Sequence, residues 1–383
     1  MKKYDLIIIG AGIAGLSLAR ELKNSGLKIL ILDKKKNVSD VTYFSSGSFI
    51  YPDEFNLPQK ILHPLKRISF HSKNRTATKS IKCCVIDRIG LLRFLEKESK
   101  RNKNLTIQYR TRVIKAVYSG NNIQHIVFSR GKKAKAEIYI DCSGISGLLA
   151  RKSGLITKRT VSALGVEYLF PLKADSHTAH FFVGKDIKKG YGWIFPKDKK
   201  TAIAGFGTIE MKDYRRVDEL FFKMWKKWKF TKICKSKPVR RIFATLRTGR
   251  PLQKFVKNNL LILGDSALQA NPLIGEGIRF VMDASRMAAP AAKMAAKSGK
   301  VSCLKSYEKR WLRKYYKNFK RCFFMQRVLK VVTGNDRILD LGTGVLDYSA
   351  DNNFKRVISA DISIPFFIRV VFSALVEKYL KKP

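Results

Sequence analysis

The chain has 383 residues, which is long enough to bury a large core and to form two domains or one elaborated domain. Its 77 lysines and arginines against 29 aspartates and glutamates give a formal net charge of +48. Such a charge indicates an anionic partner, for example lipid head groups, nucleic acid or an acidic protein. The alternative is that it only reflects a lysine-rich composition spread along the chain. Six cysteines, none in C-x-x-C spacing, argue against a zinc site or a disulfide framework and favour a reducing cytosol, and we expect neither a signal peptide nor a bilayer-spanning stretch.

A glycine-rich turn follows the first apolar segment. Residues 6–9 predict a buried parallel strand, and the small and apolar residues after the turn predict a helix packed on a sheet. In the G-x-G-x-x-G spacing between them, Gly10 permits a tight turn, Gly12 lets a diphosphate approach the backbone, and Gly15 lets helix and strand pack closely. The residues expected to contact a dinucleotide here are Gly10, Gly12, Ile13, Ala14 and Gly15.

A second strand over residues 28–33 ends in Asp33, at the distance from the turn expected of a carboxylate that holds the ribose hydroxyls of an adenosine. Three lysines follow at 34–36. A clamp for a 2′-phosphate would conflict with repulsion from Asp33, so we interpret them as a solvated lysine run. Residues 44–49 predict a loop of small residues flanked by aromatics.

The next part of the chain predicts a helix followed by short strands. Residues 85–95 enter a helix after the pair Asp87-Arg88, and residues 137–151 predict a strand ending in Asp141, a turn and a helix with a basic end. Three strands between them look like a β-meander inserted into the nucleotide-binding domain, at 105–109, 113–118 and 123–128.

Residues 161 to 250 alternate apolar and polar side chains, as in Y-G-W-I-F-P over 191–196, which predicts an antiparallel sheet with one face turned to a cavity. His177 and His180 have a possible metal-ligand spacing, but no acidic or cysteine cluster lies near them in the sequence, so we predict no metal site. A basic helix rich in aromatics is expected over 214–230.

A second glycine-rich turn follows another apolar strand. Asp265 lies at the end of that strand, and Gly275 and Gly277 open a helix whose N-terminus can face a cofactor. Two such turns, far apart in the chain and each preceded by an apolar strand, fit one extended cofactor better than two cofactors.

Three segments carry a resemblance to a known family: the first glycine turn with Asp33, the Y-x-W-x-F-P stretch at 191–196, and Gly264-Asp265 followed by N-P-L-I-G-E-G-I at 271–278. Over roughly residues 1–295 the chain resembles flavoproteins of the p-hydroxybenzoate hydroxylase-like superfamily, and most closely their geranylgeranyl reductase branch. The glycine turns are specific for the superfamily, whereas the other two stretches point to the prenyl reductases. The resemblance implies FAD as the cofactor.

The same resemblance implies roles for individual positions. The first turn and Asp33 would hold the ADP half of FAD, Arg88 would lie along the cofactor, and Asp265 would bind near the ribityl-diphosphate. Beyond the first turn, the cofactor-binding residues implied are Asp33, Arg88, Gly264, Asp265, Pro272, Gly275, Gly277 and Ile278. The residues implied to line a substrate cavity are Tyr191, Trp193 and Phe195.

The chain departs from the family at two positions. Many geranylgeranyl reductases have a cysteine in the loop that faces the flavin, whereas residues 44–49 contain none. Asp33 stands where glutamate is commoner. The first departure bears on substrate and reaction, and the second does not.

The C-terminal segment contains R-I-L-D-L-G-T-G at 337–344, which mimics the opening of a methyltransferase. Too few residues follow for that fold, so we expect a turn between helices there. Residues 307–332 predict a basic helix rich in aromatics. A last helix over 365–380 has a narrow polar stripe, and it either docks on the protein or lies in a membrane interface.

The expected fold is α/β, with a Rossmann-type FAD-binding domain, an inserted antiparallel β-sheet substrate domain and a helical C-terminal part. The expected boundaries are 1–157 and 256–297 for the FAD-binding domain, 158–255 for the substrate domain and 298–383 for the helical region.

The expected function is FAD-dependent reduction of C=C bonds in an isoprenoid (geranylgeranyl-type) lipid or related apolar substrate, by hydride transfer from flavin N5. Two alternatives stay open: a monooxygenase of the same superfamily, and a non-catalytic flavoprotein that binds a membrane or nucleic acid, although no nucleic-acid-binding motif accompanies the charge. The protein would be cytoplasmic, either free or peripheral on an anionic membrane surface. The sequence leaves open the catalytic acid, the external reductant (a nicotinamide or an electron carrier) and the oligomeric state.

Overall fold

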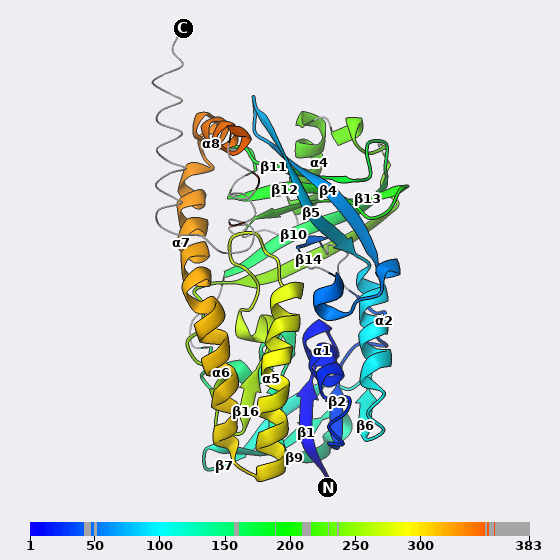
Figure 1. Ribbon diagram of the computed structural model, residues 1–383, viewed down its shortest axis with the longest axis vertical. Helices are drawn as coiled ribbons and strands as arrows, with labels where there is room; N and C mark the ends of the chain where they lie inside the picture. The colour runs from blue at the N-terminus through cyan, green and yellow to red at the C-terminus, as the bar shows by residue number, and fades with distance from the viewer. Residues whose placement is uncertain are drawn as a thin grey trace.

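The computed structural model describes residues 1–41, 47–49, 52–156, 161–187, 189–208, 216–228, 230–235, 237–348, 351 and 356. These residues form two large sheets, one in the lower and one in the upper half of Figure 1, with a long helical segment running beside both. The expected α/β fold with a parallel sheet, a second antiparallel sheet and C-terminal helices is confirmed.

The first sheet has the strand order β15-β16-β9-β1-β2-β6, and its neighbours are parallel except β15 and β16. Strand β2 and residues 6–9 of β1 are continuous apolar runs because a parallel strand covered on both faces has no solvent side. The strand bounds are β1 (Lys2–Ile9), β2 (Ile29–Leu32), β6 (Leu105–Gln108), β7 (Val113–Ser119), β8 (Asn122–Phe128), β9 (Lys132–Asp141), β15 (Val256–Lys257) and β16 (Leu260–Ile262).

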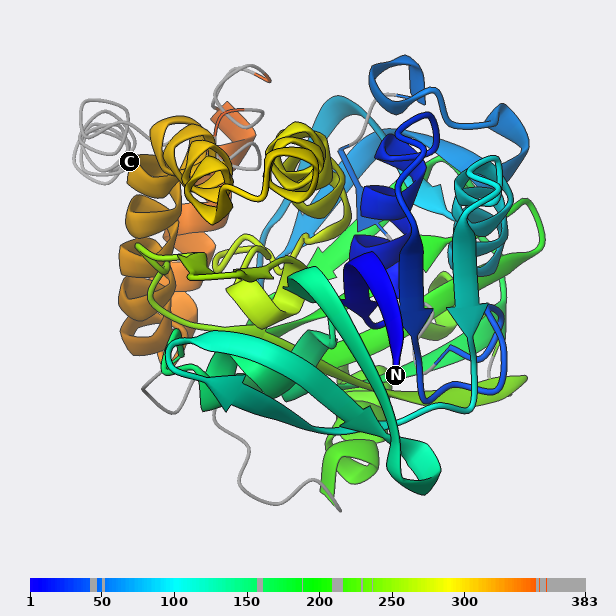
Figure 2. The same cartoon turned by 90° about the horizontal axis from the view of Figure 1, so that it is seen from below.

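Three helices cover one face of this sheet and a β-meander lies on the other (Figure 2). The helices are α1 (Ile13–Glu21), α2 (Arg88–Ser99) and α5 (Ile278–Ser298). The meander consists of β7, β8 and the start of β9, whose neighbours pair antiparallel. Strand β9 belongs to both, because it also pairs in parallel with β1 in the first sheet. The prediction that residues 105–109 begin the meander is wrong, because β6 instead pairs in parallel with β2 and forms the edge of the sheet.

The second sheet has the order β14-β10-β13-β12-β11-β4-β5-β3, and only β11 and β4 pair in parallel. The antiparallel sheet predicted between residues 161 and 250 is therefore confirmed, but β3, β4 and β5 extend it with residues that precede position 87. The domain boundaries expected from the sequence stay a prediction. The strands are β3 (Gly47–Ser48), β4 (Leu62–His71), β5 (Thr76–Ile86), β10 (Val161–Pro171), β11 (Thr178–Phe182), β12 (Gly190–Pro196), β13 (Thr201–Thr208) and β14 (Arg240–Thr248).

Helix α4 (Val217–Lys227) packs on one face of this sheet through Phe221, Met224 and Trp225. It lies within the basic, aromatic helix expected over 214–230. The opposite face of the second sheet carries another apolar cluster, which is described below. This cluster is turned toward the glycine turn that precedes α5.

The C-terminal helices link the two sheets (Figure 1). Helix α6 (Lys305–Trp311) passes through a π-helical turn (Leu312–Tyr316) into α7 (Lys317–Val332), which confirms the predicted aromatic helix. The turn predicted at 337–344 is wrong, because these residues lie inside α8 (Asp336–Tyr348), which packs beside β5. The helix predicted over 365–380 lies outside the described residues. No helix of the described ranges is both long and apolar enough to cross a bilayer.

Candidate functional site

The first glycine turn connects β1 to α1, as the sequence predicts. Gly10 has a φ of +109°, and a Cβ there would overlap the carbonyl oxygen of Cys142, which directly follows the neighbouring strand β9. A Cβ on Gly15 would overlap the carbonyl oxygen of Gly10. By contrast, a Cβ on Gly12 would meet no described atom within 4 Å, and no described side chain caps α1 at this residue. The open space and the uncapped helix end fit a diphosphate.

Asp33 lies at the carboxyl end of β2, beside the turn. Its Oδ2 accepts a hydrogen bond from the backbone N–H of Ala11 at 2.6 Å, and its Oδ1 accepts one from the N–H of Lys35 at 2.8 Å. Because each carboxylate oxygen has a further lone pair, the side chain can still accept from a pair of ribose hydroxyls.

The interpretation of residues 34–36 as a solvated lysine run is wrong for Lys35. Lys34 and Lys36 are exposed, but Lys35 folds back so that its Nζ donates to the carbonyl oxygen of Ala11 at 2.9 Å and lies 3.8 Å from Asp33 Oδ2. Burial lowers the pKa of Lys35, and the charge of Arg88 lowers it further, while Asp33 opposes the shift. Lys35 is therefore bonded to the first glycine turn and is not part of a solvated run.

The second glycine turn meets the first. Gly264 has a φ of +74°, and a Cβ there would lie 2.8 Å from the Cβ of Ala14. The adjacent Asp265 is half-buried, and burial raises the pKa of its carboxyl group while the charges of Arg88 and Arg247 lower it. Arg88, the first residue of α2, is thus within electrostatic reach of both Asp265 and Lys35.

The remaining residues of the second turn form a closed loop before α5. The N–H of Gly275 donates to the carbonyl oxygen of Asn271 at 2.9 Å, and the carbonyl oxygen of Pro272 accepts from Gln326 on α7. Gly277 is the N-cap of α5 and Ile278 its first residue, and no described side chain caps this helix end either.

Glu276 lies inside this turn, and the sequence reasoning gave it no role of its own. It is buried, and its Oε1 accepts from Ser48 Oγ at 2.6 Å and from the N–H of Phe49 at 3.0 Å. Arg279 pairs with the other oxygen at 3.1 Å. The turn thereby holds the described end of the loop predicted at 44–49, whose residues 44–46 lie outside the described ranges.

The three aromatic residues expected to line a cavity share one face of β12. Their ring centroids are 5.5 Å apart for Tyr191 and Trp193 and 6.4 Å apart for Trp193 and Phe195. The Trp193 indole fills the space over Gly205 on β13, and Phe195 packs over Gly47. The apolar cluster around them is Leu65, Ile68, Ile81, Val85, Ala179, Trp193, Phe195 and Ile203, with Phe49, Phe70, Cys83, Leu169, Phe181, Tyr191, Ile274 and Leu346 packed against it.

Tyr191 joins this aromatic face to the second glycine turn, because its hydroxyl donates to the carbonyl oxygen of Ile274 at 2.9 Å. The Tyr191→Phe variant, which removes this hydrogen bond, is expected to lose about 1 kcal/mol of unfolding free energy in urea denaturation and to keep its fold. Tyr118→Phe on the exposed β7 hairpin serves as the control. Equal stability of wild type and Tyr191→Phe would contradict the coupling of the two sheets at this point.

His177 and His180 do not come together. His177 Nδ1 bonds the carbonyl oxygen of Pro64 at 3.0 Å, whereas His180 Nδ1 lies 3.0 Å from His71 Nε2. Burial lowers the pKa of both His71 and His180 to about 4. This pair therefore stays neutral at physiological pH.

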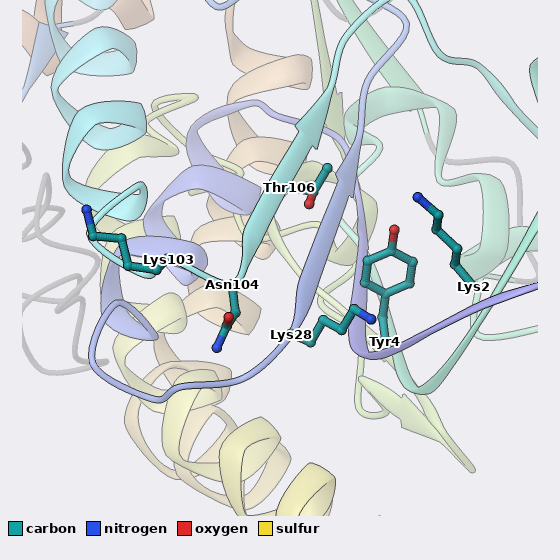
Figure 3. Close-up of a pocket in the computed structure, with 6 residues that line it drawn as sticks. All are labelled: Lys2, Tyr4, Lys28, Lys103, Asn104 and Thr106. Atoms are coloured by element: carbon teal, nitrogen blue, oxygen red, sulfur yellow. The ribbon is translucent and has the colours of Figure 1, made fainter.

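A basic groove of about 590 Å³ lies at the opposite end of the first sheet (Figure 3). Its lining residues are Lys2, Tyr4, Lys28, Lys103, Asn104 and Thr106. They lie at the amino ends of β1, β2 and β6, whereas open α/β sheets bind ligands at the carboxyl ends of their strands. We therefore place the functional site at the glycine turns and not in this groove.

Comparisons with known proteins show which proteins the chain resembles. A family model described as FAD dependent oxidoreductase matches residues 5–109, and one described as geranylgeranyl reductase catalytic domain matches residues 163–245. The chain is 28% identical to a digeranylgeranylglycerophospholipid reductase from Methanococcus aeolicus over 82% of its own length and 83% of that protein. It is 27% identical to the protein of the same name from Methanosarcina acetivorans, over 80% of each chain.

Solved structures share the fold at lower identity. A geranylgeranyl bacteriochlorophyll reductase-like protein from Thermoplasma acidophilum superimposes with a TM-score of 0.86 and 17% identity, covering 100% of this chain and 98% of the other. PqsL, a probable FAD-dependent monooxygenase from Pseudomonas aeruginosa, gives a TM-score of 0.68 and 13% identity over 90% of this chain and 100% of the other.

Proposed function

Because the chain is an FAD-dependent oxidoreductase of the geranylgeranyl reductase family, we propose that it reduces the C=C bonds of geranylgeranyl-type chains in an isoprenoid glycerophospholipid. The observation that carries this proposal is the apolar, aromatic face of β12, which continues to the second glycine turn through the bond from Tyr191 to Ile274. A prenyl chain has no hydrogen-bonding groups, so a surface of this kind can bind it by apolar contact alone.

We assign the cofactor to the line of residues that joins the two turns. Gly12 admits the diphosphate, Asp33 accepts from the adenosine ribose, and Arg88 lies opposite Asp265 along the ribityl-diphosphate. Gly275, Gly277 and Ile278 face the flavin ring at the uncapped end of α5. Bound FAD supplies a hydride equivalent at N5.

The aromatic face has a separate role, which is to bind the prenyl chain and to exclude water from it. Trp193 and Phe195 are buried and lie over glycines, so the sheet presents flat rings there. Tyr191 links this aromatic face to the second glycine turn through its hydrogen bond to Ile274.

The Trp193→Ala variant is expected to lower turnover of a prenyl substrate far more than flavin content. The indole offers apolar area worth roughly 2 to 3 kcal/mol of binding when well buried, which corresponds to a 30- to 150-fold loss in kcat/KM. The measurement is steady-state kinetics together with the flavin absorbance per chain. Equal loss of flavin and activity would instead make Trp193 a structural core residue.

Anaerobic reoxidation tests the proposed substrate. The protein is reduced chemically without oxygen and mixed with a digeranylgeranyl glycerophospholipid, and recovery of the oxidised flavin absorbance is followed. We expect recovery with this lipid and none with its fully saturated analogue, because only the former has C=C bonds to accept electrons. Recovery with neither lipid would contradict the proposed substrate class.

We propose further that the protein works at an anionic membrane surface. The net charge of +48 supports this, as do large apolar side chains exposed on α7, namely Phe324 at 61% and Val331 at 82%. Each basic residue near such a surface contributes about 1 kcal/mol, and inserted apolar side chains add burial that salt does not screen.

Sedimentation with liposomes tests the membrane proposal. The full chain is expected to bind anionic liposomes at low salt and to keep a salt-resistant fraction, and the Phe324→Ser, Val331→Ser double variant is expected to lose that fraction. Val239→Ser, at an exposed position on another part of the surface, is the control. Failure of the full chain to bind anionic liposomes at low salt would contradict the proposal.

A further inference from the structure

Arg247 on β14 is a buried cation without a partner. Its side chain is 1% exposed, and none of its three guanidinium nitrogens has a hydrogen-bond partner among the described residues. Gly147 makes room for it, because a Cβ at that glycine would lie 2.7 Å from Arg247 Nη1. An arginine cannot give up its proton in a protein, so this side chain is a permanent buried charge with five unused donors.

The surroundings of Arg247 do not neutralise it by direct contact. Asp265 and Asp141 are close enough to favour its charge, while Arg151 opposes it. The Asp141 carboxylate is already engaged by the N–H groups of Ser143, Leu149 and Ala150 and by the hydroxyl of Ser266. Without such a contact the buried guanidinium is unfavourable, and a further anion beside it would offset that cost.

The position of Arg247 shows where that anion would come from. Gly147 belongs to the turn that follows β9, and Asp265 follows β16, so the guanidinium lies at the carboxyl ends of two neighbouring parallel strands. The next strand is β1, which ends at Ile9, directly before the first glycine turn. Ligands of open α/β sheets bind along this edge. Arg247 therefore reaches from the second sheet to this edge of the first sheet, where its enclosed guanidinium borders the crevice that we propose for the cofactor.

We propose that Arg247 binds a phosphate or diphosphate group of a ligand in this crevice. The planar guanidinium offers paired donors in the geometry that phosphate oxygens accept. The group comes from one of three sources: the diphosphate of FAD itself, the diphosphate of a nicotinamide dinucleotide, or the phosphate of the lipid head group. This proposal rests on the proposed function only because it uses the same location for the cofactor. It does not depend on which reaction the protein catalyses.

Arg247→Met tests the proposal by binding measurements, with Arg241→Met as the matched control. Arg241 lies on the same strand, but it is exposed and pairs with Asp218. The apo-protein is titrated with FAD and with riboflavin, which lacks the diphosphate, by flavin fluorescence. The FAD-loaded protein is titrated with NADPH and with inorganic pyrophosphate as competitor, and with a phospholipid and its head-group-free analogue.

Loss of the charge-assisted hydrogen bonds is expected to weaken one phosphate-bearing ligand by about tenfold or more, and its phosphate-free counterpart hardly at all. A change for FAD but not riboflavin identifies the cofactor as the source. A change in affinity for NADPH identifies the nicotinamide dinucleotide as the source, and a change for the phospholipid identifies the lipid head group. Arg247→Lys should recover part of the affinity because it restores the charge. Unchanged affinity for all three ligands, or an equal change in Arg241→Met, overturns the proposal.

Thermal unfolding gives a second readout that does not depend on activity. Without ligand, Arg247→Met is expected to be at least as stable as the wild type, because it removes an unpaired buried charge. With the ligand present, the wild type should gain more stability than the variant. A ligand-free variant that unfolds well below the wild type would make Arg247 a structural residue and would overturn the proposal. The affinity and unfolding measurements remain valid tests of this proposal even if the protein reduces a different lipid.

Discussion

A Gly12→Leu variant is expected to fold and to purify without flavin, whereas the wild type purifies yellow. A side chain at this position meets no described atom within 4 Å in the protein itself, but it fills the space that we assign to the diphosphate. The measurement is flavin absorbance per chain, with the unfolding temperature of flavin-free wild type and variant measured in parallel.

Gly342→Leu is the control for this substitution. Gly342 is an exposed residue of α8, and a Cβ there also meets no described atom within 4 Å. This control should keep its flavin. Wild-type flavin content in Gly12→Leu would show that the diphosphate does not lie over the first turn.

Gly15→Ala is expected to destabilise the protein even without flavin. Its Cβ would overlap the carbonyl oxygen of Gly10, and neither backbone segment can move without separating α1 from β1. Overpacking of this kind costs about 1 to 3 kcal/mol or more, and flavin binding should fall with it. The measurement is urea unfolding of the flavin-free variant. Stability equal to that of the flavin-free wild type would contradict the tight packing. The two variants thus distinguish a glycine that the fold requires, Gly15, from one that flavin binding requires, Gly12.

The glycine turns could be predicted because their requirements are local. Gly10 needs a positive φ and Gly15 a close approach of helix to strand, and both needs appear as a short motif after an apolar run. The aromatic residues of β12 could be placed on one face because the side chains of a strand alternate.

Strand partners and loop conformations were harder to predict. Residues 105–108 have an ordinary strand pattern, which does not say that they pair with β2 rather than with the meander. A turn was expected at 337–344 because the segment mimics the glycine-rich opening of a methyltransferase. Helix α8 forms there instead because tertiary contacts outweigh the low helix propensity of glycine. Asp340 accepts from Ser72 Oγ at 2.6 Å, and Gly344 leaves space for Arg75.

The site residues that sequence reasoning missed depend on contacts between distant parts of the chain. Glu276 bonds Ser48, which lies 228 positions earlier, and nothing near either residue in the sequence signals the contact. In the sequence Lys35 does not differ from the two solvated lysines beside it, and only its hydrogen bond to Ala11 distinguishes it. Arg247 lies in no motif, and only its burial without a partner distinguishes it.

The most direct test of the reductase assignment is the product formed under oxygen labelled with ¹⁸O, with the lipid and an excess of reductant supplied. The fold is shared with probable FAD-dependent monooxygenases, so the fold alone does not decide between the two reactions. The account predicts a lipid that has gained two hydrogens for each reduced C=C bond and carries no ¹⁸O by mass spectrometry. A product that carries ¹⁸O and keeps its other C=C bonds would contradict it.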